Sequence, residues 1–277
     1  MSSGQQDTSN LLTLARRAAL AGGALLLDHW TSMGPVESVI DSVSTKSTRT
    51  DLVTAADRAS EALIVGMLQA ERPDDGLLGE EGASRAGTSG LTWVVDPLDG
   101  TVNFVYGLPL FAVSVACRDE SGALVGVVHD PVRGETFTAS AGGGAACNDT
   151  ALHLGPGPVL AEALVGTGFG YASRRRQEQA RLLGTVLPAV RDIRRGGSAA
   201  LDLCWVAAGR LDAVFEAGLQ EWDLAAGALV VEEAGGELAT IGGLIDSEPW
   251  VQTLFAAAPG LGEPLQDLVA QAAANAL

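Results

Sequence analysis

The sequence predicts a mixed fold of helices and strands, α/β with α+β layering, in which helices and strands pack as stacked layers. Segments with helical spacing of apolar residues and segments with strand-like runs occur in blocks along the chain, which is typical of layered architectures. The chain has 277 residues, of which 47% are hydrophobic, so it can bury a large core. Only 5% of the residues are aromatic, whereas 35 are glycine, which indicates close packing of small residues between layers.

Two amphipathic helices are predicted in the N-terminal part of the chain. The first covers residues 10–30, where apolar residues recur at helical spacing. Residues 31–49 are rich in Ser and Thr and are predicted to form a mobile loop. The second helix covers residues 57–70, with Thr54 and Asp57 forming a capping box at its start.

The central and C-terminal parts of the chain predict strands and further helices. Three strands joined by turn-forming residues are expected to form a meander, at residues 111–117, 123–128 and 135–139. Helices are predicted at residues 177–190, 198–209 and 222–234 and after residue 257, and strands at residues 211–215 and 253–257. No internal repeat or low-complexity linker divides the chain.

Residues 93–104 combine two carboxylates, a glycine and a hydroxyl where a buried strand is predicted to end. A proline after Asp96 removes a donor from the strand ladder, so Asp96 and Asp99 should leave the sheet edge together. Two carboxylates three residues apart can share one hard cation. Gly100 allows close approach of the backbone, and its N–H and that of Thr101 would face an anion if a short helix begins there. This composition is typical of a metal and phosphate site.

The charge balance excludes some classes of partner. The chain has 17 basic and 34 acidic residues, a formal net charge of −17, so nucleic acid and anionic membrane surfaces are poor partners. An anionic substrate is compatible with this charge if divalent cations reverse the local sign of a carboxylate cluster. The three cysteines form no C-x-x-C pair, which argues against a disulfide framework and fits a cytoplasmic location.

The N-terminus offers an alternative interpretation as a signal peptide. Arg16 and Arg17 precede an uncharged run at residues 18–27. However, no small-residue cleavage site follows, helical spacing continues to Asp28, and the run is too short to span a bilayer. Residues 1–8 are polar and are predicted to be disordered.

Four motifs carry a family resemblance. In chain order they are D-x-V-T-x-x-D at residues 51–57, G-E-E at 79–81, D-P-L-D-G-T-x-N-F at 96–104 and W-D-x-A-A at 222–226. In this combination the chain resembles the inositol monophosphatase family of metal-dependent phosphatases. The resemblance implies an α-β-α-β-α sandwich of the sugar-phosphatase type, built as one unit over residues 1–277. Residues 9–150 would form its metal and phosphate half, and residues 151–277 its substrate-recognition half.

The resemblance also implies a magnesium centre with two to three ions per active site. The metal ligands would be Glu80, Asp96, the backbone carbonyl of Leu98, Asp99 and Asp223. Thr101, hydrogen-bonded to Asp57, and Glu80 would orient and deprotonate the attacking water. The substrate would contact Asp99, Gly100, Thr101, Ser198, Ala199, Glu216, Asp223 and Lys46. Among these, Glu216 would meet a polyol hydroxyl and Lys46 would close over the phosphate.

The motif spacing argues against two other phosphoryl-transfer classes. Haloacid-dehalogenase phosphatases carry D-x-D-G-T, whereas the pair here is D-x-x-D-G-T, one residue longer. Those enzymes also need a late catalytic lysine, and Lys46 is the only lysine in the chain, which likewise excludes a P-loop. A metal-activated water is therefore favoured over a covalent phosphoenzyme.

The predicted function is hydrolysis of myo-inositol 1-phosphate, a small-molecule phosphate monoester, with lithium sensitivity and a homodimer expected from the family. Histidinol phosphate, fructose 1,6-bisphosphate and 3′-phosphonucleotides remain alternative substrates on the same fold. Gln220 stands where animal members carry His, which leaves the sugar specificity open. A non-catalytic regulatory protein is the rival of another class, but an exposed, self-repelling acid cluster favours catalysis.

Overall fold

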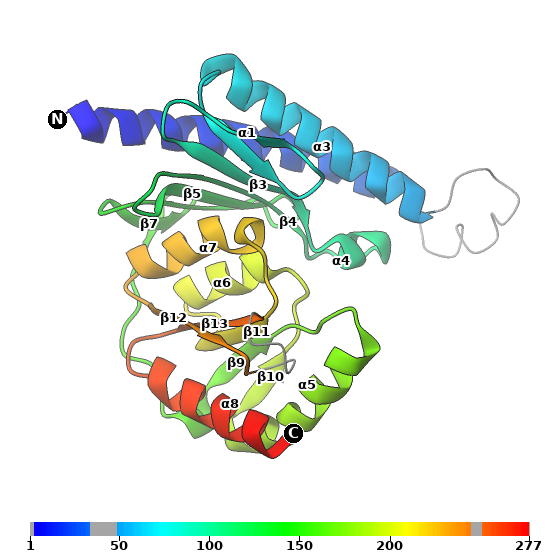
Figure 1. The fold of residues 1–277 in the computed structure, drawn as a ribbon, viewed down its shortest axis with the longest axis vertical. Helices are drawn as coiled ribbons and strands as arrows, with labels where there is room; N and C mark the ends of the chain where they lie inside the picture. The colour runs from blue at the N-terminus through cyan, green and yellow to red at the C-terminus, as the bar shows by residue number, and fades with distance from the viewer. Residues whose placement is uncertain (1–2, 34–48, 245–250, 277) are drawn as a thin grey trace, which may run out of the picture.

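The computed structural model describes residues 3–33, 49–244 and 251–276. Their helices and strands form five layers in the order α-β-α-β-α, which confirms the predicted fold class (Figure 1). One outer helical layer contains α1 (Ser3–Ser32) and α3 (Arg49–Glu71), which pack on each other and on the first sheet. The other outer layer contains α5 (Ser173–Val186) and α8 (Gly262–Ala276), also packed together.

The first sheet has eight strands in the order β2-β1-β3-β4-β5-β6-β7-β8. All neighbours are antiparallel except β1 and β3, which are parallel. The strands are β1 (Gly76–Gly79), β2 (Ser84–Arg85), β3 (Thr92–Asp99), β4 (Ala112–Arg118), β5 (Ala123–Asp130), β6 (Glu135–Ser140), β7 (Gly144–Cys147) and β8 (Thr150–Leu152). The predicted meander corresponds to β4, β5 and β6, while β1, β2, β7 and β8 are too short to show a clear period in the sequence.

The second sheet has five strands in the order β10-β9-β11-β13-β12. They are β9 (Leu164–Thr167), β10 (Asp192–Arg194), β11 (Ala213–Ala217), β12 (Glu237–Gly242) and β13 (Gln252–Ala257). Single 3₁₀ turns cover Leu160–Glu162 and Leu187–Ala189. The first sheet ends at Leu152 and the second begins at Leu164. The assignment of metal binding and substrate recognition to halves divided at residue 150 remains a prediction.

The layer between the sheets contains α6 (Ala199–Ala207) and α7 (Glu221–Glu233). Small residues make its close packing possible, as the composition predicts. A Cβ at Gly126 of β5 would stand 2.8 Å from the Cα of Ala226 in α7, and one at Gly227 would stand 2.9 Å from the side chain of Leu203 in α6. Helix α7 is thereby held close to the first sheet, and α6 close to α7.

Two expectations for the N-terminal helices are wrong. α1 begins at Ser3, so residues 3–8 continue the helix instead of being disordered, because extending a helix that is already nucleated and packed costs little. α3 begins at Arg49, so residues 54 and 57 lie inside it and do not form a capping box at its start. The predicted loop at residues 31–49 falls mostly outside the described residues.

Helix α1 also bears on the membrane question. From Asp7 to Ser32 it is long and apolar enough to cross a bilayer by length and composition alone. In the fold it is a core helix, since Leu11, Leu14, Ala18 and Leu26 are almost completely buried in the cluster shared with α3 and the first sheet. Its apolar face is therefore accounted for by packing.

The sequence predicts that the strand before Pro97 ends there, and this prediction is wrong. Strand β3 continues to Asp99 through a β-bulge. Asp96 pairs with Ser114 and Asp99 pairs with Ala112, so two residues of β3 lie opposite one residue of β4. The bulge accommodates the proline, and both aspartates remain on the strand.

Candidate active site

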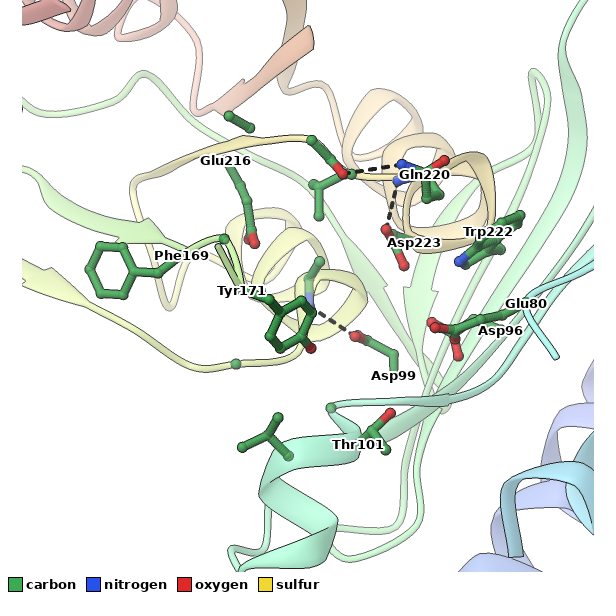
Figure 2. Close-up of a pocket in the computed structure, with 18 of the residues that line it drawn as sticks. Glu80, Asp96, Asp99, Thr101, Phe169, Tyr171, Glu216, Gln220, Trp222 and Asp223 are labelled. Atoms are coloured by element: carbon green, nitrogen blue, oxygen red, sulfur yellow. Dashed lines mark hydrogen bonds between the residues drawn. The ribbon is translucent and has the colours of Figure 1, made fainter. Parts of the chain in front are cut away.

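A pocket of about 240 Å³ opens where the bulged end of β3 meets the N-termini of α6 and α7 and the end of β11. Its lining comes from segments distant in sequence, which only the layered packing brings together (Figure 2). Nine of the twelve predicted site residues line it: Glu80, Asp96, Leu98, Asp99, Gly100, Thr101, Ala199, Glu216 and Asp223. Of the other three, Asp57 and Ser198 lie buried behind the lining, and Lys46 lies outside the described residues.

The bulge positions Asp96. Its Oδ1 accepts a hydrogen bond of 3.0 Å from the backbone N–H of Leu98, and the side chain is 1% exposed. The hydroxyl of Ser60 in α3 donates to the carbonyl of Pro97 at 3.1 Å, which ties the bulge to the helical layer. Glu80 follows β1, its N–H donates to the carbonyl of Val95 at 3.2 Å, and its carboxyl shares a hydrogen bond with Asp96.

Asp99 is held from the far side of the pocket by the start of α6. The hydroxyl of Ser198, the N-cap of α6, donates to Asp99 Oδ2 at 2.5 Å. The backbone N–H of Ala200 donates to the same oxygen at 2.8 Å, and that of Ala199 donates to Oδ1 at 3.3 Å. The donors that the sequence assigns to a substrate anion at Ser198 and Ala199 are thus used by Asp99 in this structure. The α6 N-terminus favours negative charge there.

Thr101 and Asp57 do not form the predicted hydrogen bond. Thr101 is the first residue of α4 (Thr101–Val105), preceded by Gly100 at φ 94°, and its hydroxyl donates to the carbonyl of Leu98 at 3.1 Å. A hydroxyl has only one proton, so this contact competes with Asp57. Asp57 is 3% exposed, and its Oδ1 has no hydrogen-bond partner among the described residues. The loss of water around this buried oxygen is therefore not compensated by a hydrogen bond within the described residues.

Asp223 reaches the pocket from the first turn of α7. Gln220 is the N-cap, and its backbone N–H donates to Asp223 Oδ2 at 2.7 Å within a capping box. The hydroxyl of Ser114 in β4 donates to the carbonyl of Trp222 at 3.3 Å, which connects this turn to the first sheet. The W-D-x-A-A motif therefore begins a helix, as predicted, with its acid facing the pocket.

Glu216 lies on β11 and points into the pocket from the second sheet (Figure 2). A Cβ at Gly168, after β9, would collide with its carboxylate, so this glycine leaves the space that the acid occupies. Burial raises the pKa of Glu216 to about 7, and the charge of Asp99 acts in the same direction. Glu216 thus lines the same pocket as the carboxylates of β3.

Burial raises the pKa of every acid in this cluster, and the charges of neighbouring acids add to the rise for Asp57, Glu80, Asp96, Asp99 and Glu216. Burial raises the pKa of Asp99 to about 7 and that of Asp57 to about 8. The pKa of Asp96 lies well above its usual range because of burial and of the neighbouring charges of Asp99, Glu80 and Asp223. Glu80 and Asp223 are shifted upward by burial as well. Such a cluster is unstable when fully ionised unless a cation compensates it.

The donor set fits a hard divalent cation. All the side-chain donors are carboxylate oxygens, which Mg²⁺ prefers, and the buried Oδ1 of Asp57 has no hydrogen-bond partner among the described residues. Among residues 3–33, 49–244 and 251–276, however, no three such side chains converge closely enough to hold one ion. Asp99 is instead hydrogen-bonded to Ser198 at the start of α6, and Asp223 to the backbone of Gln220.

The sequence did not reveal one side of the pocket. The turn after β9 contributes Phe169 and Tyr171, and two arginines, Arg175 and Arg195, complete the lining. Tyr171 is 83% exposed and lies across the pocket from Thr101. The only available signal was the concentration of arginines at residues 174–195 of an acidic chain, which does not indicate where they lie relative to the acids.

Comparisons with known proteins identify the family of this chain. The family model described as the inositol monophosphatase family matches residues 7–276. A protein from Mycobacterium leprae named inositol-1-monophosphatase is 46% identical over 234 residues, covering 80% of this chain and 79% of its own length. A protein from Pasteurella multocida named Nus factor SuhB is 42% identical over 228 residues, covering 82% and 83%. The solved structure of Mycobacterium tuberculosis SuhB superposes with a TM-score of 0.79 at 39% identity, covering 95% of this chain and 97% of that one. The chain therefore belongs to the inositol monophosphatase family of phosphoric monoester hydrolases.

Proposed function

We propose that the protein hydrolyses myo-inositol 1-phosphate to inositol and phosphate with Mg²⁺ as cofactor. The observation that carries the proposal is the convergence of Glu80, Asp96, Asp99 and Asp223, from three different elements, on the same pocket as Glu216. A metal-dependent reaction is also the general property of the family. The relatives named inositol-1-monophosphatase support this choice of substrate.

The proposed metal ligands are Glu80, Asp96, the carbonyl of Leu98, Asp99 and Asp223. Magnesium ions bound there would neutralise the acids and the substrate phosphate and lower the pKa of water at the site. Two ions would share Asp96, whose pKa is raised by burial and by the neighbouring charges of Asp99, Glu80 and Asp223. Binding of two to three ions per site stays a prediction.

The remaining roles concern the water and the substrate. Glu80 and Thr101 would orient the water and Glu80 would accept its proton, since a general base must be within reach of that proton, while Asp57 would support them from behind the lining. Gly100 and Thr101 lie where the phosphate would approach the end of β3. Glu216 would accept a hydrogen bond from an inositol hydroxyl, and Lys46 would cover the phosphate. Ser198 acts through Asp99, which it holds in place.

The finer expectations for the protein as a whole also remain proposals: lithium sensitivity, a homodimer, a cytoplasmic location and no nucleic-acid partner. The last of these is opposed by one observation, because relatives of similar identity are named Nus factor SuhB. The rival regulatory role predicts no turnover from an intact pocket. Release of phosphate therefore distinguishes the two.

The test is release of phosphate from a panel of monoesters, with and without Mg²⁺, by the wild type and by Asp96→Asn. Inositol 1-phosphate should be hydrolysed only with Mg²⁺, and Asp96→Asn should lower turnover by orders of magnitude while circular dichroism shows an intact fold. Glu71→Gln, an exposed change on α3, is the matched control. Full activity in excess chelator, or retained hydrolysis in Asp96→Asn, would contradict the proposal.

A further inference from the structure

Arg175 and Arg195 are the only cationic side chains that line the pocket among the residues that the structure describes. Arg175 belongs to α5 and is half-buried, and Arg195 follows β10 and is exposed. The other charged lining residues are the acids Glu80, Asp96, Asp99, Glu216 and Asp223. In a chain of net charge −17, two guanidinium groups at such a pocket need an explanation.

Each guanidinium group lies against a glycine of the pocket wall. Gly218 has φ 83° and follows Glu216 by two residues, and a Cβ there would stand 2.7 Å from Nη1 of Arg175. Gly197 has φ 90° and directly precedes Ser198, and a Cβ there would collide with Nη1 of Arg195. The positive φ alone favours glycine. The missing side chains additionally leave the wall open to both arginines.

The charge of Arg195 acts on the leaving-group side of the pocket. Burial raises the pKa of Glu216 and the charge of Asp99 adds to this, whereas Arg195 lowers it. Arg195 likewise opposes the burial that raises the pKa of Tyr171. Within the described part of the chain, no carboxylate lies within 4 Å of the Arg195 guanidinium as an ion pair. Its guanidinium group lines the same pocket as Glu216, on the side where the alcohol part of a substrate is proposed to bind.

We propose that Arg175 and Arg195 form an anion subsite for a second negatively charged group, a phosphate or a carboxylate, on the alcohol part of the substrate. The inference rests on the proposed phosphatase function of the same pocket. Guanidinium groups suit both ligands because they donate two parallel hydrogen bonds. A second anion next to Glu216 would otherwise be repelled, so the subsite selects esters that bear one.

Matched substrate pairs test the proposal. Fructose 1,6-bisphosphate differs from fructose 1-phosphate by the second phosphate, and 3-phosphoglycerate differs from glycerol 3-phosphate by a carboxylate. The wild type should show a higher kcat/KM for the member that carries the second anionic group in at least one pair, and the preferred pair identifies that group. Arg195→Gln and Arg175→Gln should reduce that preference about tenfold, a change of about 1.4 kcal/mol, mainly through KM.

Arg194→Gln is the control, because Arg194 is exposed, pairs with Asp192 and does not line the pocket. It should leave the preference unchanged. Equal losses on both members of a pair in the pocket variants would overturn the proposal, because general steering or support of the fold affects all substrates alike. No preference in the wild type would overturn it as well.

The two proposals fail differently. If the wild type hydrolyses inositol 1-phosphate but shows no preference within either pair, the subsite is wrong and the phosphatase function stands. If it hydrolyses no monoester with Mg²⁺, the proposed function fails. In that case, binding of fructose 1,6-bisphosphate measured by calorimetry, and its loss in Arg195→Gln but not in Arg194→Gln, still decides the subsite.

Discussion

The hydroxyl of Ser198 donates to Asp99 Oδ2 at 2.5 Å, across 99 residues of sequence. It connects the end of β3 in the first sheet to the N-terminus of α6 in the middle layer. The same hydroxyl oxygen accepts the backbone N–H of Leu201 at 3.3 Å and so caps the helix. One side chain therefore both begins a helix and fixes a proposed metal ligand.

Replacement of Ser198 by alanine should affect stability and metal use together. Loss of the cap and of the bond to Asp99 is expected to lower the free energy of unfolding by about 1–2 kcal/mol in urea denaturation. This bond lowers the pKa of Asp99, so the variant should also need more Mg²⁺ for half-maximal activity at neutral pH, because protons compete better. Ser84→Ala on the exposed edge strand β2 is the control and should change neither quantity. Unchanged Mg²⁺ dependence would show that Asp99 is held by the backbone alone.

Glu216 should govern which alcohol leaves rather than the chemistry of the phosphate. Glu216→Ala is expected to lower kcat/KM for inositol 1-phosphate by roughly 1–3 kcal/mol in transition-state terms, because one hydrogen bond to a charged group is lost. An aryl phosphate, which has no hydroxyl to meet Glu216, should be hydrolysed almost as before. Equal losses on both substrates would mean that Glu216 supports the metal site or the fold.

Asp202 makes a separate prediction about pH. It is 2% exposed in α6, and burial raises its pKa from 3.8 to about 8, with the charges of Glu216 and Asp99 adding to the rise and that of Arg195 opposing it. Between these pH values the folded state holds a proton that the unfolded state has lost. Stability therefore falls as pH rises through this window.

Asp202→Asn should remove that contribution. Urea unfolding in chelator at several pH values should give a shallower decline for the variant, so its stability relative to the wild type improves from pH 5 to pH 8. Asp149→Asn, at an exposed turn, is the matched control and should run parallel to the wild type. Parallel curves for Asp202→Asn would contradict the prediction.

Magnesium should stabilise the protein more at high pH than at low pH. The acids of the pocket bind a cation only when deprotonated, and the pKa values of Asp96, Asp99, Glu80 and Asp223 are all raised. The increase in melting temperature caused by Mg²⁺ should therefore be larger at pH 8 than at pH 5. If the increase in melting temperature did not depend on pH, the Mg²⁺ ion would bind outside this cluster of acids.

Lithium should inhibit the Mg²⁺-dependent reaction. A small monovalent cation can occupy a carboxylate site near Asp223 without supplying enough charge to support turnover. A titration of lithium at fixed Mg²⁺ should give saturable inhibition, whereas sodium at equal ionic strength should not. Indifference to high lithium concentrations would count against the proposed metal geometry.

The sequence determined the parts of this protein whose signals are local. Helical spacing located α6 and α7 within one or two residues, because their apolar faces repeat along the chain. The four motifs contain seven of the nine predicted site residues that line the pocket, and Ala199 and Glu216 lie outside them. A metal and phosphate site requires carboxylates and glycines at fixed spacings along the chain. The order of these residues in the sequence therefore indicates the chemistry.

Tertiary structure decided what depends on contacts between distant segments. The bulge that keeps Pro97 within β3 depends on the neighbouring strand β4 and on the anchor of Ser60 in α3. The hydroxyl of Thr101 bonds to Leu98 because the turn brings that carbonyl within reach, although the motif suggested Asp57. The arginines of the pocket come from α5 and the end of β10, two elements whose distance from the acids is set by the packing of five layers. Local periodicity contains no information about such distances, since they arise from burying each layer's apolar face against the next.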